Sequence, residues 1–191
     1  VLQSNDCSTP LIRLRVPTLA DGGYQNVLNQ ITSLVQQMRE HSEKQPTKIG
    51  ICTPGVIDPQ TNRMKNCNAT CLNGQPLAQD LPEVLGVEVI TSNDANCFAL
   101  AESRLGAARG ATTTFGVIMG SGVGGGIVIG ETVLYGKHGI AGEWGHNPLD
   151  PTNGPECYCG RRGCVETILA GPFLERYYTK LSGCKLTLKE I

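Results

Sequence analysis

Soft metal ligands are crowded into one short, turn-rich segment, and this feature limits the chain more than any other. Residues 146–166 read HNPLDPTNGPECYCGRRGCVE and contain His146, Cys157, Cys159 and Cys164. Thiolates and an imidazole suit Zn²⁺, and structural zinc sites take four such ligands in a tetrahedron. We therefore predict a structural zinc that does not activate water, because all four positions are filled. Free buried thiols, or a disulfide between two of the three cysteines, are the alternatives.

The composition of the chain excludes several classes of function. It holds nine cysteines among 191 residues, and no signal-peptide pattern is visible. An odd cysteine count favours a reducing cytosol over a disulfide framework, so we expect a cytoplasmic protein. The net charge is −1, no basic stripe is visible, and no apolar run reaches the length of a membrane span. We therefore expect neither a nucleic-acid partner nor a membrane partner.

Apolar residues recur at periods that alternate between strand and helix along the chain. Expected strands cover residues 10–17, 47–58, 63–69, the first part of 87–106 and two runs within 112–136. Expected helices cover residues 21–43, 76–85, the rest of 87–106 and 172–181. Such alternation is typical of an α/β fold. We expect a lobe boundary near residues 106–112, which divides the chain into 1–108 and 109–191.

Two carboxylates flank the metal-like loop in the sequence. Glu143 precedes His146 by three residues, and Glu166 follows the last cysteine of the loop. A zinc bound in the loop would hold both carboxylates and the His146 ring near one another. The imidazole can bind the metal through one nitrogen and a hydroxyl through the other. This set makes a good cage for neighbouring sugar hydroxyls. Alternatively, the carboxylates are solvated or pair with Arg161 and Arg162, and spacing alone does not choose.

A run of glycines lies between two apolar, strand-like segments. Residues 119–126 read MGSGVGGG. Such a turn lets successive backbone N–H groups face an anion, and Ser121 adds a hydroxyl donor. The run is neither a Walker loop, since no Gly-Lys-Ser/Thr follows, nor a good dinucleotide fingerprint, since no helix clearly opens after it. A plain hairpin turn is the alternative.

An Asn-Asp pair ends one apolar strand and opens a helix. The segment is SNDAN, residues 92–96, and it includes Asp94. The carboxyl end of a strand is where α/β proteins place ligands. A carboxylate held there can accept a proton from a substrate hydroxyl. A helix cap with no further role is the alternative.

Together these motifs resemble the ROK family (repressor, open reading frame, kinase), a group of sugar kinases in the actin-like ATPase superfamily. The matching pieces, in the family's order, are ICTPGVID, KNCNATCLNGQPL, TSNDANCFALAE, MGSGVGGGIVIG, GIAGEWGHNPL and CYCGRRGCVET. They cover most of residues 47–170. The resemblance implies a two-lobed actin-like fold with an inserted zinc loop. It implies a sugar-binding lobe over residues 1–108 and a nucleotide-binding lobe over 109–191.

The resemblance also implies a role for each matching residue. Asp94 is then the general base that deprotonates the attacking sugar hydroxyl. The implied sugar-binding residues are Gly55, Asn68, Asn93, Asp94, Glu143, His146 and Glu166. The implied second phosphate loop for ATP consists of Gly120, Ser121, Gly122 and Gly124. The implied ligands of a structural zinc are His146, Cys157, Cys159 and Cys164.

The function implied by the resemblance is an ATP-dependent hexose kinase. The wording of NATCLNGQPL and GEWGHNPL is most similar to bacterial fructokinases and manno(fructo)kinases. It implies fructose or mannose as the substrate, with glucose as a further candidate. The resemblance also implies a cytoplasmic homodimer that uses Mg²⁺ with ATP.

Two parts of the family pattern are not found in the sequence. The family opens with a strand and an Asp-x-Gly-Gly-Thr turn, whereas Asp21-Gly22-Gly23 here precedes a helix. The family also continues past the zinc loop to a glycine-rich adenosine-binding turn. We therefore expect a fragment that binds ATP poorly alone. The alternative functions are a sugar-responsive repressor, which needs a helix-turn-helix, and a zinc module that only binds a partner protein.

Overall fold

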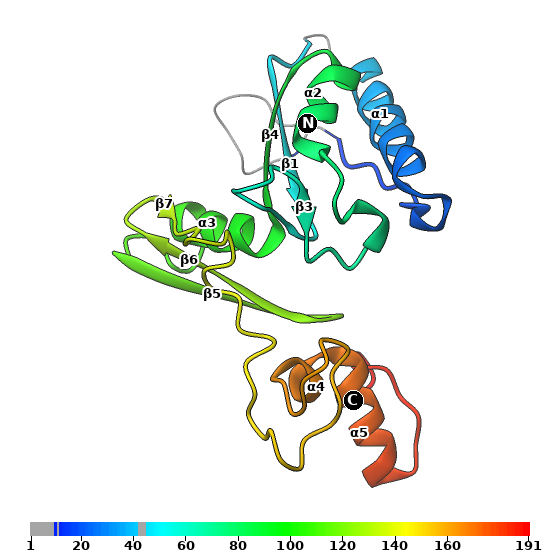
Figure 1. Cartoon of the computed structure of the whole chain (residues 1–191), viewed down its shortest axis with the longest axis vertical. Coiled ribbons are helices and arrows are strands. Elements are labelled where there is room, and N and C mark those ends of the chain that lie inside the picture. Colours follow the sequence, from blue (N-terminus) through cyan, green and yellow to red (C-terminus); the bar gives the residue numbers. More distant parts are fainter. Residues whose placement is uncertain (1–9, 11, 42–44) are drawn as a thin grey trace. The chain divides into compact units, whose positions relative to one another are not determined.

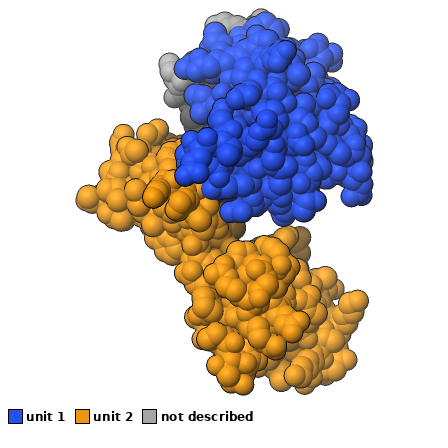
Figure 2. Space-filling view, in the orientation of Figure 1, with its two compact units in different colours: residues 1–93 blue, residues 94–191 orange. Residues whose placement is uncertain are grey.

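The computed structural model describes residues 10, 12–41 and 45–191 (Figure 1). The chain forms two compact units, residues 1–93 and 94–191 (Figure 2). Among the described residues, none of the helices combines the length and the apolar character that a membrane crossing requires.

Unit 1 contains two short sheets and two long helices. Its helical segments are η1 (Ala20–Gly22), α1 (Tyr24–Glu40), η2 (Thr70–Leu72) and α2 (Leu77–Leu85). Its strands are β1 (Lys48–Thr53), β2 (Val56–Ile57), β3 (Met64–Lys65) and β4 (Glu88–Asn93). β1 pairs with β4 in parallel and β2 pairs with β3 antiparallel. The register aligns Thr53 with Asn93, so β1 and β4 end at the same edge.

The core of unit 1 lies under the apolar faces of α1 and α2. Both helices match the periodicity in the sequence, which places apolar residues on one face at helical spacing. α2 ends at Gly86, whose left-handed conformation favours glycine. The buried residues of this core are Val27, Leu28, Met64, Cys67, Leu72, Leu77, Leu81 and Leu85.

Unit 2 begins with a helix that packs on an antiparallel sheet. The elements are α3 (Asp94–Leu105), β5 (Thr113–Met119), β6 (Val123–Ile129) and β7 (Thr132–Val133), with sheet order β5-β6-β7. Glycines let the helix approach the strands closely. A Cβ on Gly116 would lie 2.8 Å from the Ala99 Cβ, and one on Gly126 would lie 2.7 Å from the Ala95 carbonyl oxygen. These glycines therefore serve helix packing.

The rest of unit 2 is a long irregular stretch followed by two helices. Residues 146–164, called here the Cys/His loop, have only isolated bridges, one of which joins Pro148 to Cys164. The helices are α4 (Glu166–Leu169) and α5 (Gly171–Ser182). The helix expected over residues 172–181 is thus confirmed, whereas α4 was not predicted.

Two expectations differ from the structure. The alternating stretch 10–17 forms no strand in its described residues, because alternation of apolar and basic side chains does not by itself provide a pairing partner. The compact units divide after Asn93, whereas the sequence placed the lobe boundary at 108/109. α3 packs on β5 and β6, so it lies with the second unit. The assignment of sugar and nucleotide to separate lobes stays a prediction.

Candidate functional site

The Cys/His loop brings its four predicted metal ligands together. The ligand atoms of His146, Cys157, Cys159 and Cys164 all lie within 4.8 Å of one another. The Cys157 Sγ lies 3.5 Å from the His146 Nδ1, and the Cys159 Sγ lies 3.7 Å from the Cys164 Sγ. Ligand atoms around a tetrahedral zinc lie about 3.3 to 3.8 Å apart when the bonds are about 2.0 to 2.3 Å long. The donor set therefore fits a closed zinc site.

Backbone turns shape the loop around these ligands. The Cys157 N–H donates to the Arg161 carbonyl at 2.8 Å, and the Gly160 N–H donates back to the Cys157 carbonyl at 3.0 Å. Gly160 and Gly163 have φ angles of +84° and +61°, which strain any residue with a side chain. A Cβ on Gly163 would also collide with the Asp150 carbonyl. The two glycines noted beside the cysteines are thus required by the fold of the loop.

The thiols of the loop differ in their electrostatic surroundings. Arg161 hydrogen-bonds the Cys159 thiol and lowers its pKa to about 6. Burial instead raises the pKa of Cys164 to about 11. The protein alone therefore does not stabilise every thiolate that a zinc site needs. A bound divalent cation would displace the remaining protons.

Glu166 connects the loop to the glycine-rich turn. It opens α4 and is 8% exposed. Its Oε2 accepts a hydrogen bond from the Val123 N–H at 2.9 Å. A Cβ on Gly122 would lie 2.7 Å from the same oxygen. The glycine at position 122 therefore leaves room for a buried carboxylate, for which the sequence left open a sugar, solvent or an ion pair with Arg161 or Arg162.

Four predicted site residues of unit 2 share one electrostatic neighbourhood. Glu143 keeps an exposed surface, but the surrounding protein removes part of its hydration and raises its pKa. The charge of Asp94 raises this pKa further, His146 opposes the shift, and Glu166 adds to it. The acidic groups and the imidazole thus lie within electrostatic range of Glu143.

His146 has the two-sided geometry that its predicted role requires. Its Nδ1 faces the Cys157 sulfur, while its Nε2 lies 3.0 Å from the Tyr158 hydroxyl. The two rings pack edge to face with their centroids 5.1 Å apart. The sequence did not predict Tyr158 as a site residue. Its position between two cysteine ligands was the only signal available.

The glycine run forms the turn of the β5–β6 hairpin. The Gly120 N–H donates to the Gly122 carbonyl at 2.9 Å, and the Gly171 N–H donates to the Gly120 carbonyl at 2.8 Å. Ser121 is exposed at the tip. The Gly124 carbonyl accepts a hydrogen bond from the Trp144 indole at 2.8 Å. The alternative interpretation, a hairpin turn, is therefore correct in geometry, and phosphate binding by the same turn stays a prediction.

Asp94 is the first residue of α3 and is exposed. Its Oδ1 accepts a hydrogen bond from the Ala95 N–H at 2.9 Å. The role of Asp94 as a general base stays a prediction.

Unit 1 holds the remaining predicted sugar ligands. Asn93 is buried, and its Nδ2 donates to the Gly55 carbonyl at 3.5 Å. A Cβ on Gly55 would lie 2.5 Å from both the Cys67 sulfur and the Lys65 carbonyl oxygen. Asn68 follows Cys67 and is exposed. The structure thus brings Gly55 and Asn93 together, with Asn68 on the adjoining loop.

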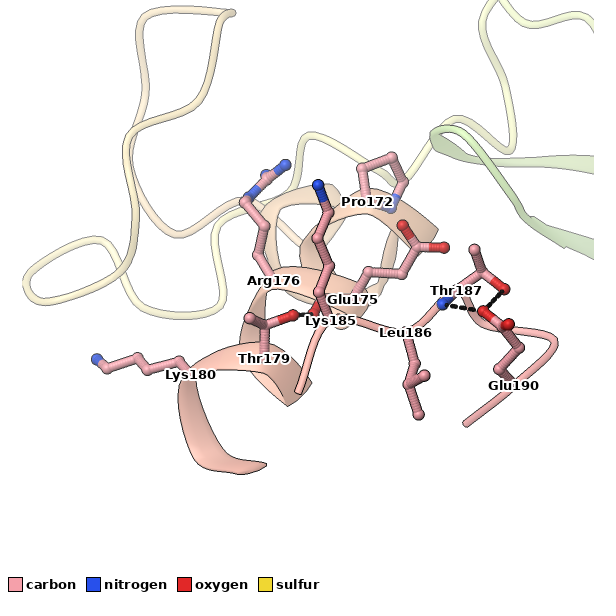
Figure 3. Close-up of a pocket in the computed structure, with 9 residues that line it drawn as sticks. All are labelled: Pro172, Glu175, Arg176, Thr179, Lys180, Lys185, Leu186, Thr187 and Glu190. Carbon is pink, nitrogen blue, oxygen red and sulfur yellow. Dashed lines mark hydrogen bonds between the residues drawn. The ribbon is translucent and has the colours of Figure 1, made fainter. Parts of the chain in front are cut away.

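A pocket lies elsewhere in unit 2, between α5 and the segment after it (Figure 3). Its lining residues are Pro172, Glu175, Arg176, Thr179, Lys180, Lys185, Leu186, Thr187 and Glu190. Glu190 accepts hydrogen bonds from Thr187, and Glu175 accepts one from the Leu188 N–H, so both carboxylates tie this segment in place. No predicted site residue lines the pocket.

The sequence of the chain matches the model of the ROK family over residues 6–191. The chain belongs to the ROK family. Its sequence is 38% identical over 178 residues to the N-acetyl-D-glucosamine kinase of Histophilus somni, covering 88% of this chain and 58% of that protein. It is 34% identical over 161 residues to the glucokinase of Thermotoga maritima, covering 84% of this chain and 50% of that one. The chain thus spans little more than half the length of these ROK relatives.

Solved ROK structures have the same fold. The ROK hexokinase of Thermus thermophilus matches with a TM-score of 0.74 at 34% identity, covering 92% of this chain and 58% of that one. The ROK glucokinase of Streptomyces griseus, in complex with glucose and AMPPNP, matches with a TM-score of 0.73 at 29% identity, covering 84% and 51%. The α/β architecture is therefore that of the actin-like ATPases, as the sequence predicted.

Proposed function

We propose that this chain serves an ATP-dependent hexose kinase, which transfers the γ-phosphate of ATP to a sugar hydroxyl. The observation that carries the proposal is the electrostatic neighbourhood of Asp94, Glu143, His146 and Glu166. The names of its ROK relatives, which describe kinases for glucose and N-acetylglucosamine, support the same reaction class.

Asp94 is the proposed general base. A carboxylate within reach of the attacking hydroxyl accepts its proton as the new O–P bond forms. Asp94 begins α3 directly after β4, at the carboxyl edge of the parallel pair, and its side chain is exposed. This is the edge at which α/β folds bind substrates.

The sugar hydroxyls bind to side chains that lie in the Cys/His loop or beside it in the sequence. Glu143 and Glu166 accept hydrogen bonds from hydroxyls, and the Nε2 of His146 bonds a further one. Gly55, Asn68 and Asn93 are the proposed contributions of unit 1. A raised pKa of Glu143 suits this role, because a partly desolvated carboxylate gains more from a hydrogen-bond donor than a solvated one does.

The glycine turn is the proposed phosphate loop. Gly120, Gly122 and Gly124 present backbone without side chains near the tip of the β5–β6 hairpin, where an anion can approach, and Ser121 adds a hydroxyl donor. A Mg²⁺ ion bound with ATP would neutralise charge on the phosphates. The Cys/His loop, with zinc as its proposed ion, holds its carboxylates and imidazole in place and takes no part in the chemistry.

Four sugars are candidates for the preferred substrate. The sequence wording favours fructose or mannose, whereas the relatives described above are named for glucose and N-acetylglucosamine. The homodimer and the cytoplasmic location also remain predictions. A sugar-responsive regulator is the second candidate function, since a ROK transcriptional regulator has the same fold with a TM-score of 0.74 at 24% identity.

The test separates sugar binding from phosphate transfer. Titration calorimetry measures the affinity for glucose, N-acetylglucosamine, mannose and fructose, and a coupled assay follows ADP release with each. Asp94→Asn should lower turnover by at least about a thousandfold, because the base is lost, and should change sugar affinity only a few-fold. Asp21→Asn, an exposed aspartate of η1, is the matched control.

Two outcomes would contradict the proposal. Full turnover in Asp94→Asn would remove this residue from its role as the base. Sugar binding without any turnover, under conditions in which ATP binds, would favour the regulator.

A further inference from the structure

Tyr158 lies in the Cys/His loop but is not one of the four predicted zinc ligands, and it contacts the proposed sugar site. It lies between Cys157 and Cys159, and its hydroxyl is 3.0 Å from the His146 Nε2. Burial, followed by the nearby Glu166 carboxylate, raises the pKa of this phenol. One phenol group therefore bonds His146 and lies near Glu166, which belong to different parts of the site.

Both residues are among those proposed to receive the sugar. His146 turns its Nδ1 toward the Cys157 sulfur, so its Nε2 is the nitrogen that remains for a hydroxyl. A phenol hydroxyl and a sugar hydroxyl are the same kind of group, since each has one donor and acceptor lone pairs. In this structure the Tyr158 hydroxyl has the contact with His146 that a sugar hydroxyl would make.

Little else holds the tyrosine in this position. The residue is 82% exposed. Its ring meets the His146 ring edge to face at 5.1 Å, which is its one aromatic contact among the described residues. A side chain with so little buried apolar surface can rotate away without losing core packing. The backbone beside it is held by the bonds that Cys157 makes with Arg161 and Gly160.

We propose that Tyr158 is a substrate-mimicking gate that occupies one sugar-hydroxyl position and sets the sugar specificity of the site. The inference rests on the proposed function. A sugar whose hydroxyl reaches the His146 Nε2 replaces the bond of the phenol and displaces it. A sugar that lacks a hydroxyl there does not replace this bond, so the phenol stays and the sugar binds weakly.

Tyr158→Phe tests the gate, because it removes the hydroxyl and keeps the ring. Glucose affinity, measured by titration calorimetry on the full chain, should tighten about two- to tenfold, which corresponds to the net worth of one hydrogen bond. Tyr177→Phe, which changes an exposed tyrosine on α5, should leave affinity unchanged. Elemental analysis of zinc confirms that both variants retain the metal.

Monodeoxy-glucoses sharpen the test. The gain from Tyr158→Phe should disappear for the one analogue that lacks the hydroxyl received by the His146 Nε2, and it should persist for the others. An equal or weaker glucose affinity in zinc-loaded Tyr158→Phe overturns the gate while the proposed function stands. Absence of binding in both proteins for every hexose overturns the proposed function, and the gate with it.

Discussion

The Cys/His loop and the β5–β6 hairpin hold site residues in unit 2 by different means. The hairpin has a continuous antiparallel ladder from Thr113–Ile129 to Met119–Val123, and α3 covers it over a core that includes Val128. The loop has isolated bridges instead, and few of its side chains are apolar. The hairpin therefore owes its shape to the strand ladder and to burial. The loop owes its shape to the predicted metal ligands that gather around one point. Stability and local order should respond separately to a change in either.

Loss of the proposed zinc should have the largest effect, and this effect should be confined to the Cys/His loop. Cys164→Ser removes a fully buried ligand, and loss of zinc affinity should weaken sugar binding by at least about tenfold. Hydrogen–deuterium exchange should rise across residues 146–165 and stay low across 113–129. Cys184→Ser, at an exposed cysteine outside the cluster, is the control.

Chelation gives the same comparison without a mutation. Sugar affinity should fall before the core unfolds. Unaltered affinity after verified zinc removal would show that the loop does not depend on the metal.

Gly126→Ala should destabilise the packing of α3 on the β5–β6 hairpin. The new Cβ would lie 2.7 Å from the Ala95 carbonyl oxygen, a backbone atom that cannot turn aside. We expect a loss of about 1 to 3 kcal/mol in the free energy of unfolding, measured by denaturant titration, with zinc content unchanged. Gly120→Ala, in the turn of the same hairpin, has no atom within 4 Å of its new Cβ and should change stability by less than about 0.5 kcal/mol. Equal losses in the two variants would contradict the packing argument.

Glu143→Gln should have the smallest effect on the free energy of unfolding. The Glu143 Oε2 would lie 3.7 Å from a Cβ on Gly124, and its pKa is raised by desolvation, by Asp94 and by Glu166. Because the folded-state pKa lies above that of the unfolded chain, ionisation of Glu143 opposes folding above the folded pKa. The variant should gain a few tenths of a kcal/mol near neutral pH, after screening by solvent.

The pH dependence of this gain provides the check. The gain should shrink as the pH falls through the folded pKa and vanish below 4.5, the usual value for this group. Thermal melts of both proteins across this range, with zinc content verified at each pH, measure it. A gain that grew toward acid pH would contradict the assigned direction.

Local patterns predicted much of the fold. The helices α1, α2 and α3 follow apolar spacing that a short window displays, and the β5–β6 hairpin follows two apolar runs joined by glycine. The stretch 10–17 shows where such patterns fail, because alternation indicates a strand only when another strand is there to pair with it. α4 was missed because four residues are too few for a period to appear.

The sequence by itself predicted the Cys/His cluster, since the four ligands that its spacing indicated, His146, Cys157, Cys159 and Cys164, lie together in the structure. Only the tertiary structure decided how that loop meets the rest of unit 2. The bond from the Val123 N–H to Glu166 spans 43 positions, and the bond from the Trp144 indole to the Gly124 carbonyl spans 20. Ligand spacing is a local property that a short window contains, whereas contacts between distant segments depend on how the whole chain packs.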